Sequence, residues 1–250
     1  MSKNLLLWIS AFVIVFLFTL VRPYIRGEQP VSGTIGIEGK KISYLFPREW
    51  EAGTDLKFLI RNDNPKVTGY YVINLPDGKK VKKELTVGKE ELIGVLPAAK
   101  PGESVDYTVF LKYDDKQTQI PYNTTLTTVF TGKVSLIIKI FYPLMLFILS
   151  LLAVRGGLEF FNEEGRYKLY TIFTAGAAVC LSFIIVPVRN LLLIAPPAGT
   201  IPPPGDMFTA ETFFYSVLWV LVSILVFFNI KPGFTLLVGS MFTLAGLLFI

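Results

Sequence analysis

Five apolar stretches dominate this chain, and a single long polar segment separates the first from the other four. They cover residues 5–21, 134–154, 169–188, 212–230 and 234–250. At about 1.5 Å per helical residue, each can cross the roughly 30 Å hydrocarbon core of a bilayer. The chain is 52% hydrophobic with a mean hydropathy of +0.54, above that of ordinary soluble domains. We therefore predict a membrane α-helical bundle of five transmembrane helices that carries one water-exposed domain.

The first apolar stretch is interpreted as a signal anchor within residues 1–26. Its core is longer than that of a usual cleaved signal peptide, Arg22 and Pro23 follow it directly, and no small-x-small cleavage site is present. Residues 134–250 are then expected to form a four-helix transmembrane domain. Its last two helices are joined only by Lys231-Pro-Gly, which predicts an antiparallel hairpin.

Basic residues near the ends of the apolar stretches favour one orientation by a small margin. If Lys3 lies inside, then Arg155, Arg166, Lys168 and Lys231 lie inside as well. An equal number of basic residues falls on the opposite side, so the positive-inside rule alone separates the two orientations poorly. The signal-anchor interpretation favours the same orientation. We therefore expect segment 27–133 on the extracytoplasmic side.

Within residues 27–133, apolar side chains recur at every second position, which is typical of half-buried strands. The alternation is clearest where Val105, Tyr107, Val109 and Leu111 share one face of a strand. Turn residues recur about every ten positions, and seven or eight short antiparallel strands predict a β-sandwich. Basic and acidic residues are almost equal in number here, so the segment lacks the basic face expected of a nucleic-acid-binding domain.

One local pattern in this segment is more specific. Residues 96–113, LPAAKPGESVDYTVFLKY, resemble the strand E–F corner of fibronectin type III domains, where a Pro-Gly turn precedes a strand with a corner tyrosine. The resemblance implies an Ig/fibronectin type III-like sandwich in which the Tyr107 hydroxyl closes the corner. The alternative is that Tyr107 is an ordinary aromatic residue of the strand core.

The near absence of two residue types, histidine and cysteine, limits the chemistry available to this chain. There is no histidine and only one cysteine, Cys180, so no cofactor or metal site and no imidazole-based catalysis is expected. Arg155 and Glu159 have i,i+4 spacing in a loop that also holds Glu163, Glu164 and Arg166, and we interpret it as a solvated turn at the lipid headgroups. Residues 189–211 are rich in proline and are expected to be a helix-free loop.

Small residues in the third and fifth stretches are candidates for close helix packing, either within the chain or against other subunits. They are Ala175, Gly176, Ala178, Ser182, Gly239, Ser240, Ala245 and Gly246. Cys180 is expected to be a packing residue of the same helix.

Taken whole, the chain resembles an uncharacterised family of bacterial inner-membrane proteins. Gly39-Lys-Lys-Ile-Ser-Tyr-Leu-Phe-Pro47 matches the segment that opens the family's β-sandwich, and Arg155-Gly-Gly-Leu-Glu159 matches its motif after the second span. The resemblance implies a signal anchor, a periplasmic sandwich and four further spans in the inner membrane. The family has a Gly-rich stretch after the third span, whereas residues 186–206 here are Pro-rich.

These observations favour a non-catalytic accessory subunit of an inner-membrane complex, with an energy-converting, electron-transfer assembly as the leading candidate. Its partners would be other membrane-protein subunits, lipids and an extracytoplasmic subunit such as a cytochrome domain. A stand-alone transporter or channel for an uncharged or lipidic substrate is the alternative, and a cavity lined by Ser182, Ser216 and Ser223 would favour it. A membrane-bound enzyme that uses the loop from Glu159 to Arg166, or Asp206, is the third hypothesis.

Overall fold

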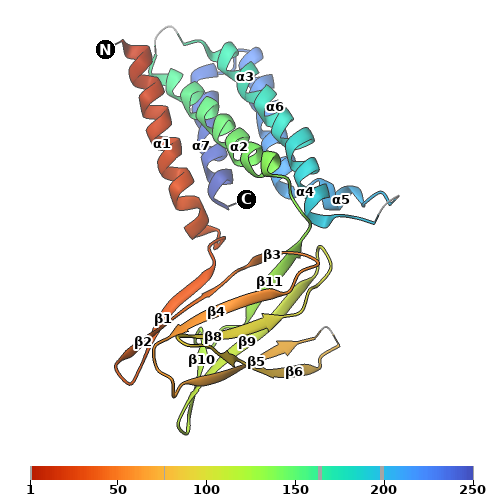
Figure 1. Ribbon diagram of the computed structural model, residues 1–250. Helices are drawn as coiled ribbons and strands as arrows, with labels where there is room; N and C mark the ends of the chain where they lie inside the picture. Colours follow the sequence, from red (N-terminus) through yellow and green to blue (C-terminus); the bar gives the residue numbers. More distant parts are fainter. Residues whose placement is uncertain (1, 76, 163–164, 198–199, 250) are drawn as a thin grey trace. The chain divides into compact units, whose positions relative to one another are not determined.

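A computed structural model of the chain describes residues 2–75, 77–162, 165–197 and 200–249 (Figure 1). It divides into two compact units. The helical unit comprises Met1–Gly27, Val134–Leu192 and Pro196–Ile250, and the β unit comprises Glu28–Lys133 with Leu193–Ala195. The first helix belongs to the helical unit although the whole β unit separates it in sequence from the other helices.

The helical unit contains helices long and apolar enough to span a membrane. Four qualify among the described residues: Lys3–Ile25, Leu136–Phe161, Tyr167–Ile194 and Pro232–Phe249. A further apolar helical segment, Phe213–Phe227, is shorter. The elements in chain order are α1 (Lys3–Ile25), α2 (Leu136–Gly157), the 3₁₀ turn η1 (Leu158–Phe161), α3 (Tyr167–Cys180), the π-helical turn η2 (Leu181–Ile185), α4 (Val186–Ile194), α5 (Pro204–Met207), α6 (Ala210–Phe227) and α7 (Pro232–Phe249).

The third helical segment differs from the sequence-based expectation in its length. It continues past residue 188 through α4 to Ile194, and the short helix α5 forms inside the Pro-rich region that was expected to lack helix. Pro187 removes one backbone donor from the helix, and the π-helical turn directly before it accommodates this local defect. Pro204 stands in the first turn of α5, where a missing N–H costs nothing.

The helices of this unit pack through a shared apolar core and through small residues. Leu149 of α2, Trp219 of α6 and Leu236 of α7 are fully buried in it. At Gly157 of α2, an added Cβ would collide with the Ser240 side chain of α7, so this glycine allows the two helices to approach closely. The Trp219 indole N–H donates to the Thr243 hydroxyl (3.1 Å), which satisfies a polar group inside the core.

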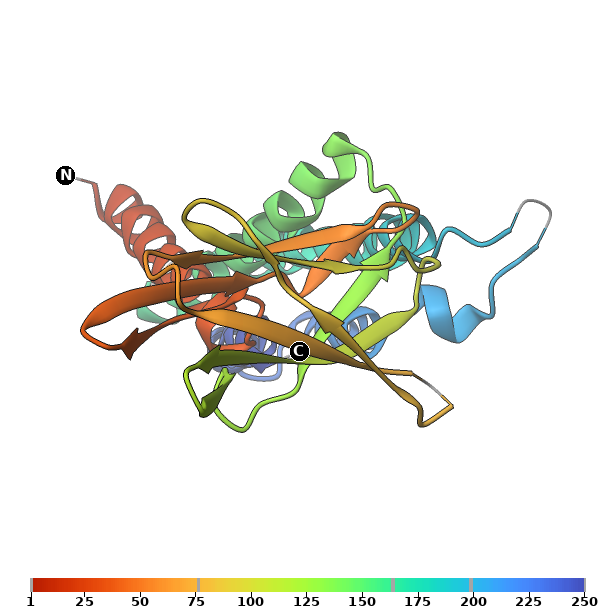
Figure 2. The same cartoon turned by 60° about the horizontal axis from the view of Figure 1, so that its bottom comes forward.

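The β unit is built from two sheets that face each other (Figures 1 and 2). The first sheet has the order β1 (Val31–Ile37), β2 (Lys40–Phe46), β4 (Leu56–Asn62), β8 (Glu91–Leu96), β7 (Thr86–Val87). The second has the order β3 (Glu49–Glu51), β11 (Leu126–Thr131), β9 (Ser104–Tyr113), β5 (Thr68–Asn74), β6 (Lys80–Glu84), with β10 (Lys116–Ile120) paired to β9. All pairs are antiparallel except β3 with β11. The expected sandwich-like arrangement is confirmed, with more strands than the seven or eight predicted.

Alternating residues of both sheets form the core of the β unit. Phe58 of β4 packs against the Tyr107 ring of β9, with ring centroids 5.5 Å apart. Gly94 lies opposite Phe58 in the register of β4 and β8, and a side chain at this position would overlap the Phe58 ring. The Tyr71 hydroxyl of β5 donates to the carbonyl oxygen of Val95 on β8 (2.5 Å), which joins the two sheets by a hydrogen bond.

Candidate functional site

A buried ion pair lies at one end of the helical unit. Arg155, in the last turn of α2, and Glu159, in η1, are each only 1% exposed. Arg155 Nη1 lies 2.5 Å from Glu159 Oε1. The interpretation of these two residues as part of a solvated turn is therefore wrong. The helical segment continues past residue 154 to Phe161, so the i,i+4 spacing places both side chains on the same face. That face is buried in the bundle.

Residues from α1 and from the segment between η1 and α3 complete this site, which we call the Arg155 cluster: Asn4, Arg155, Glu159, Asn162 and Arg166. The other Arg155 nitrogen, Nη2, donates to Asn4 Oδ1 in α1 (2.6 Å). Glu159 Oε2 accepts from Asn162 Nδ2 (3.0 Å) and from the Arg166 backbone N–H (2.9 Å). Both carboxylate oxygens of Glu159 therefore have hydrogen-bond donors, as a buried charge requires.

Aromatic rings border the guanidinium of Arg155. Its central carbon lies 4.7 Å from the centroid of the Tyr170 ring and 5.5 Å from that of Trp8. The two rings are themselves 6.3 Å apart in an edge-on arrangement. A guanidinium between aromatic faces gains cation–π stabilisation, which contributes most where water is excluded. The cluster thereby connects α1, α2 and α3.

The Arg155 cluster borders a cavity of about 320 Å³, lined by Lys3, Asn4, Arg155, Glu159, Asn162, Arg166 and Tyr170. Three of these residues are basic and one is acidic. The side chains of Lys3 and Arg166 form no ion pair with an acidic residue of the described chain. Glu163 and Glu164, which the sequence analysis placed in the same loop, lie outside the described residues. As lined by the described residues, the cavity is a polar, basic pocket at the end of an apolar helix bundle.

Tyr107 was expected either to close a corner by its hydroxyl or to be a core aromatic. Its side chain is completely buried, and its hydroxyl makes no hydrogen bond with the described residues. The neighbouring Thr128 hydroxyl donates instead to the Pro47 carbonyl oxygen (2.8 Å). Burial raises the pKa of the Tyr107 phenol to about 12, and the nearby Thr128 side chain offsets part of this effect. The geometry is that of a core aromatic.

The small residues proposed for helix packing separate into two groups. Ala178, Ser182, Gly239, Ser240 and Gly246 are buried in the helical unit, and Ala175 is half-buried. Gly176 and Ala245 are exposed, so they do not pack against other helices of this chain. The reason is rotational: positions 176 and 245 lie on the outer faces of α3 and α7.

The outer face of the first β-sheet carries an exposed apolar row. Leu45, Leu59 and Ile93 lie opposite one another on β2, β4 and β8, and they point away from the core. Leu45 is 55% exposed, Leu59 is 47% exposed and Ile93 is half-buried. We call these three residues the apolar row. Lys57 and Arg61, two positions either side of Leu59 on β4, give it a basic border.

On the outer face of the second sheet, two lysine side chains lie beside a stacked aromatic pair. Tyr70 and Phe110 stack with ring centroids 5.0 Å apart. The amino groups of Lys82 and Lys112 lie 4.1 and 4.9 Å from the Tyr70 ring centroid. Lysine side chains that lie over a ring shield its apolar surface while their charges stay in water. On the first sheet, by contrast, Leu45 and Leu59 face each other across β2 and β4 and both remain about half exposed.

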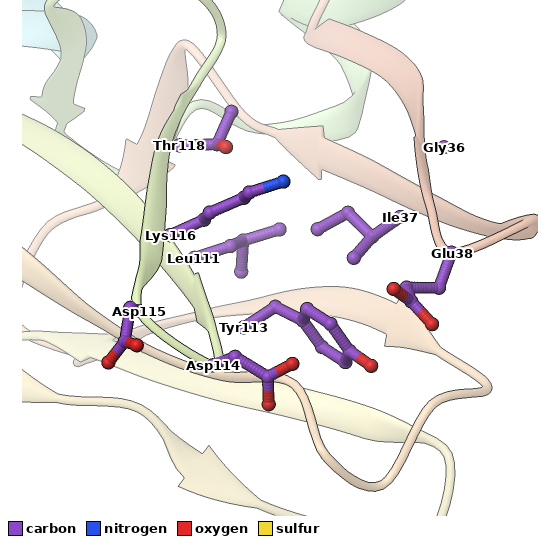
Figure 3. A pocket seen from close by; sticks show the side chains of 9 residues that line it. All are labelled: Gly36, Ile37, Glu38, Leu111, Tyr113, Asp114, Asp115, Lys116 and Thr118. Atoms are coloured by element: carbon purple, nitrogen blue, oxygen red, sulfur yellow. The ribbon is translucent and has the colours of Figure 1, made fainter.

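A second cavity, of about 420 Å³, lies between the hairpin that joins β1 to β2 and the hairpin that joins β9 to β10 (Figure 3). Figure 3 shows the Tyr113 ring between Glu38 and Asp114, with the Lys116 side chain crossing the opening. Its acidic residues do not converge as ligands, and the described residues contain no group of three potential metal-binding side chains.

The remaining sequence candidates are dispersed. Asp206 is exposed on the short helix α5, and Cys180 is half-buried at the end of α3. Ser182 and Ser216 are buried, and the hydroxyl oxygens of both lack a hydrogen-bond partner within the described chain. Neither serine lines either of the two cavities described above, so neither cavity is the serine-lined one that would favour a transporter.

No family model, curated protein or solved structure matches this chain.

Proposed function

We propose that this chain is a membrane-anchored, non-catalytic accessory subunit of a bacterial inner-membrane complex. In this proposal its helices anchor it in the bilayer, and its sandwich docks a partner on the periplasmic side. The apolar row of Leu45, Leu59 and Ile93 is the observation that carries the proposal.

The membrane assignment is supported by the distribution of apolar side chains on the helices. Leu6, Phe16 and Leu20 of α1 are about half exposed, and similar side chains cover the outer faces of the other long helices. Exposed apolar surface of this extent is costly in water and favourable in lipid. With α6 as the fifth span, the bundle crosses the membrane five times, which matches the resemblance to the inner-membrane family.

The strand order supports an Ig-like type of sandwich. The order β2-β4-β8-β7 corresponds to strands A-B-E-D of an immunoglobulin domain, and β11-β9-β5 corresponds to strands G-F-C. In this assignment β1, β3, β6 and β10 are additional strands. Domains of this type commonly serve in recognition, although the fold alone does not determine a function.

The apolar row supports docking because two exposed leucines on adjacent strands, Leu45 and Leu59, form a single patch. An exposed apolar patch with a polar border is typical of a protein interface. The basic border formed by Lys57 and Arg61 favours a partner surface with an apolar ridge between acidic side chains. An extracytoplasmic subunit of an energy-converting complex, such as a cytochrome domain, is the partner that we propose.

Co-purification tests this proposal. The full chain is isolated from native membranes in mild detergent, and stoichiometric partners are quantified by mass spectrometry. We expect the double variant Leu45→Glu/Leu59→Glu to recover at least about tenfold less partner, since charges would be buried in the interface.

The control places two charges on the outer face of the second sheet, at the paired positions Val72 and Thr108. The variant Val72→Glu/Thr108→Glu should retain the partner. The proposal is wrong if the wild-type chain recovers no stoichiometric protein, or if both double variants lose it equally.

A further inference from the structure

We propose that the cavity beside the Arg155 cluster binds a phosphate group, either in the headgroup of an anionic lipid or as a free phosphate. This inference relies on the membrane-spanning part of the proposed function but not on docking by the sandwich. Its test is separate from the co-purification experiment.

The charge balance of the described residues that line the cavity favours an anion. Among them, Lys3, Arg155 and Arg166 contribute three positive charges, and Glu159 contributes one negative charge. The Glu159 carboxylate is fully engaged by Arg155, Asn162 and the Arg166 backbone, as described above. Its charge is therefore balanced locally by Arg155. Among the described lining residues, the amino group of Lys3 and the guanidinium of Arg166 then leave an excess of positive charge.

Unused donors point to the same ligand. Arg155 Nε is buried and has no acceptor among the described residues, although both terminal nitrogens of this guanidinium are used. A buried donor without an acceptor costs free energy, and a ligand oxygen or a water would remove that cost. Arg166 directly precedes α3, so the positive end of that helix adds to the field at the cavity.

The position and size of the cavity suit a lipid headgroup. Its residues come from the start of α1, the end of α2 with η1, and the start of α3, so it lies where three spans reach one membrane surface. Basic pockets between transmembrane helices are typical sites for anionic headgroups. A volume of about 320 Å³ accommodates a phosphate with its glycerol, which is the headgroup of phosphatidylglycerol.

Binding to the delipidated full chain in a non-ionic detergent tests the proposal with three probes: dioctanoyl-phosphatidylglycerol, dioctanoylglycerol without phosphate, and inorganic phosphate. The affinities are measured by thermophoresis at constant ionic strength. We expect phosphatidylglycerol or inorganic phosphate to bind and dioctanoylglycerol to bind at least about tenfold more weakly. Binding of the lipid alone identifies a headgroup site, whereas binding of inorganic phosphate identifies a site that also accepts the free anion.

Two exposed cations allow the site to be weakened without breaking the buried pair. We expect Lys3→Gln and Arg166→Gln each to reduce the affinity about fivefold, and their combination to reduce it further. Lys168→Gln removes a neighbouring exposed charge that does not line this cavity and should leave the affinity unchanged. The proposal is overturned if neither phosphate probe exceeds dioctanoylglycerol, or if the Lys3→Gln/Arg166→Gln variant binds like the wild-type chain.

Discussion

The guanidinium of Arg155 donates a hydrogen bond to the side chain of Asn4, which lies 151 positions earlier in the chain. This bond connects α1 to α2 within the helical unit, although the entire β unit is inserted between them in sequence. The same guanidinium is paired with Glu159. A single buried side chain thus links the first helix to the later ones.

Removal of one member of this pair should destabilise the helical unit strongly. We expect Arg155→Gln to lower the free energy of unfolding by about 3–5 kcal/mol, because Glu159 would keep a buried charge without its partner. Thermal unfolding in detergent measures the effect. Lys79→Gln breaks an exposed pair with Asp77 (3.1 Å) and serves as the control, with little expected change. Equal effects of the two substitutions would contradict the buried geometry.

Two helix glycines should respond in opposite ways to the same substitution. A Cβ added at Gly239 of α7 would lie 2.8 Å from Val222 Cγ2 of α6, whereas nothing lies within 4 Å of a Cβ added at Gly176. We therefore expect Gly239→Leu to cost about 1–3 kcal/mol through overpacking. Gly176→Leu should be neutral or stabilising, since it faces outward and gains helix propensity. Comparison of the two unfolding midpoints tests the packing.

Two buried tyrosines of the sandwich differ in the use of their hydroxyls. Tyr71→Phe removes the hydrogen bond to the Val95 carbonyl and should cost about 1 kcal/mol. Tyr107→Phe removes a hydroxyl that has no hydrogen-bond partner among the described residues, and it should cost nothing or stabilise the domain. Denaturant unfolding monitored by the sandwich tryptophan, Trp50, measures both. A larger loss for Tyr107→Phe would instead support the corner role suggested by the fibronectin-like pattern.

The raised pKa of Tyr107 predicts a loss of stability in alkali. The unfolded phenol ionises near pH 10, whereas burial keeps the folded one protonated up to about pH 12. Its contribution is complete below pH 10 and is lost between pH 10 and 12, by about 2–3 kcal/mol. Tyr107→Phe should remove this part of the pH dependence. Unfolding curves at several pH values, with phenolate absorbance at 295 nm, test the prediction, and identical curves for both chains would refute it.

Periodicity was sufficient to predict the main elements of the fold. Each apolar stretch, and the alternation in residues 27–133, reflects which side chains of a single helix or strand are buried. That pattern is visible directly in the sequence. The Arg155–Glu159 pair was misinterpreted because its environment depends on where α2 ends. Their i,i+4 spacing, directly after an apolar stretch, was the available signal for a continued helix.

Other features depend on contacts between separate helices or strands, which the periodicity of a single segment does not reveal. Leu45 and Leu59 lie far enough apart in sequence that only the register of β2 and β4 makes them adjacent. Gly176 and Gly239 look alike in sequence, but the rotation of each helix decides which one is buried. The tolerance of Pro187 within a helix likewise depends on the π-helical turn before it.

Site-specific photocrosslinking from the apolar row tests the docking proposal most directly. Benzoylphenylalanine is introduced at Leu59 of the full chain in intact cells, and at Thr108 on the outer face of the second sheet as the control. We expect position 59 to give one discrete adduct with a single protein and position 108 to give none. An absence of adducts at position 59, or equal and diffuse adducts at both positions, would contradict a docking surface on this sheet.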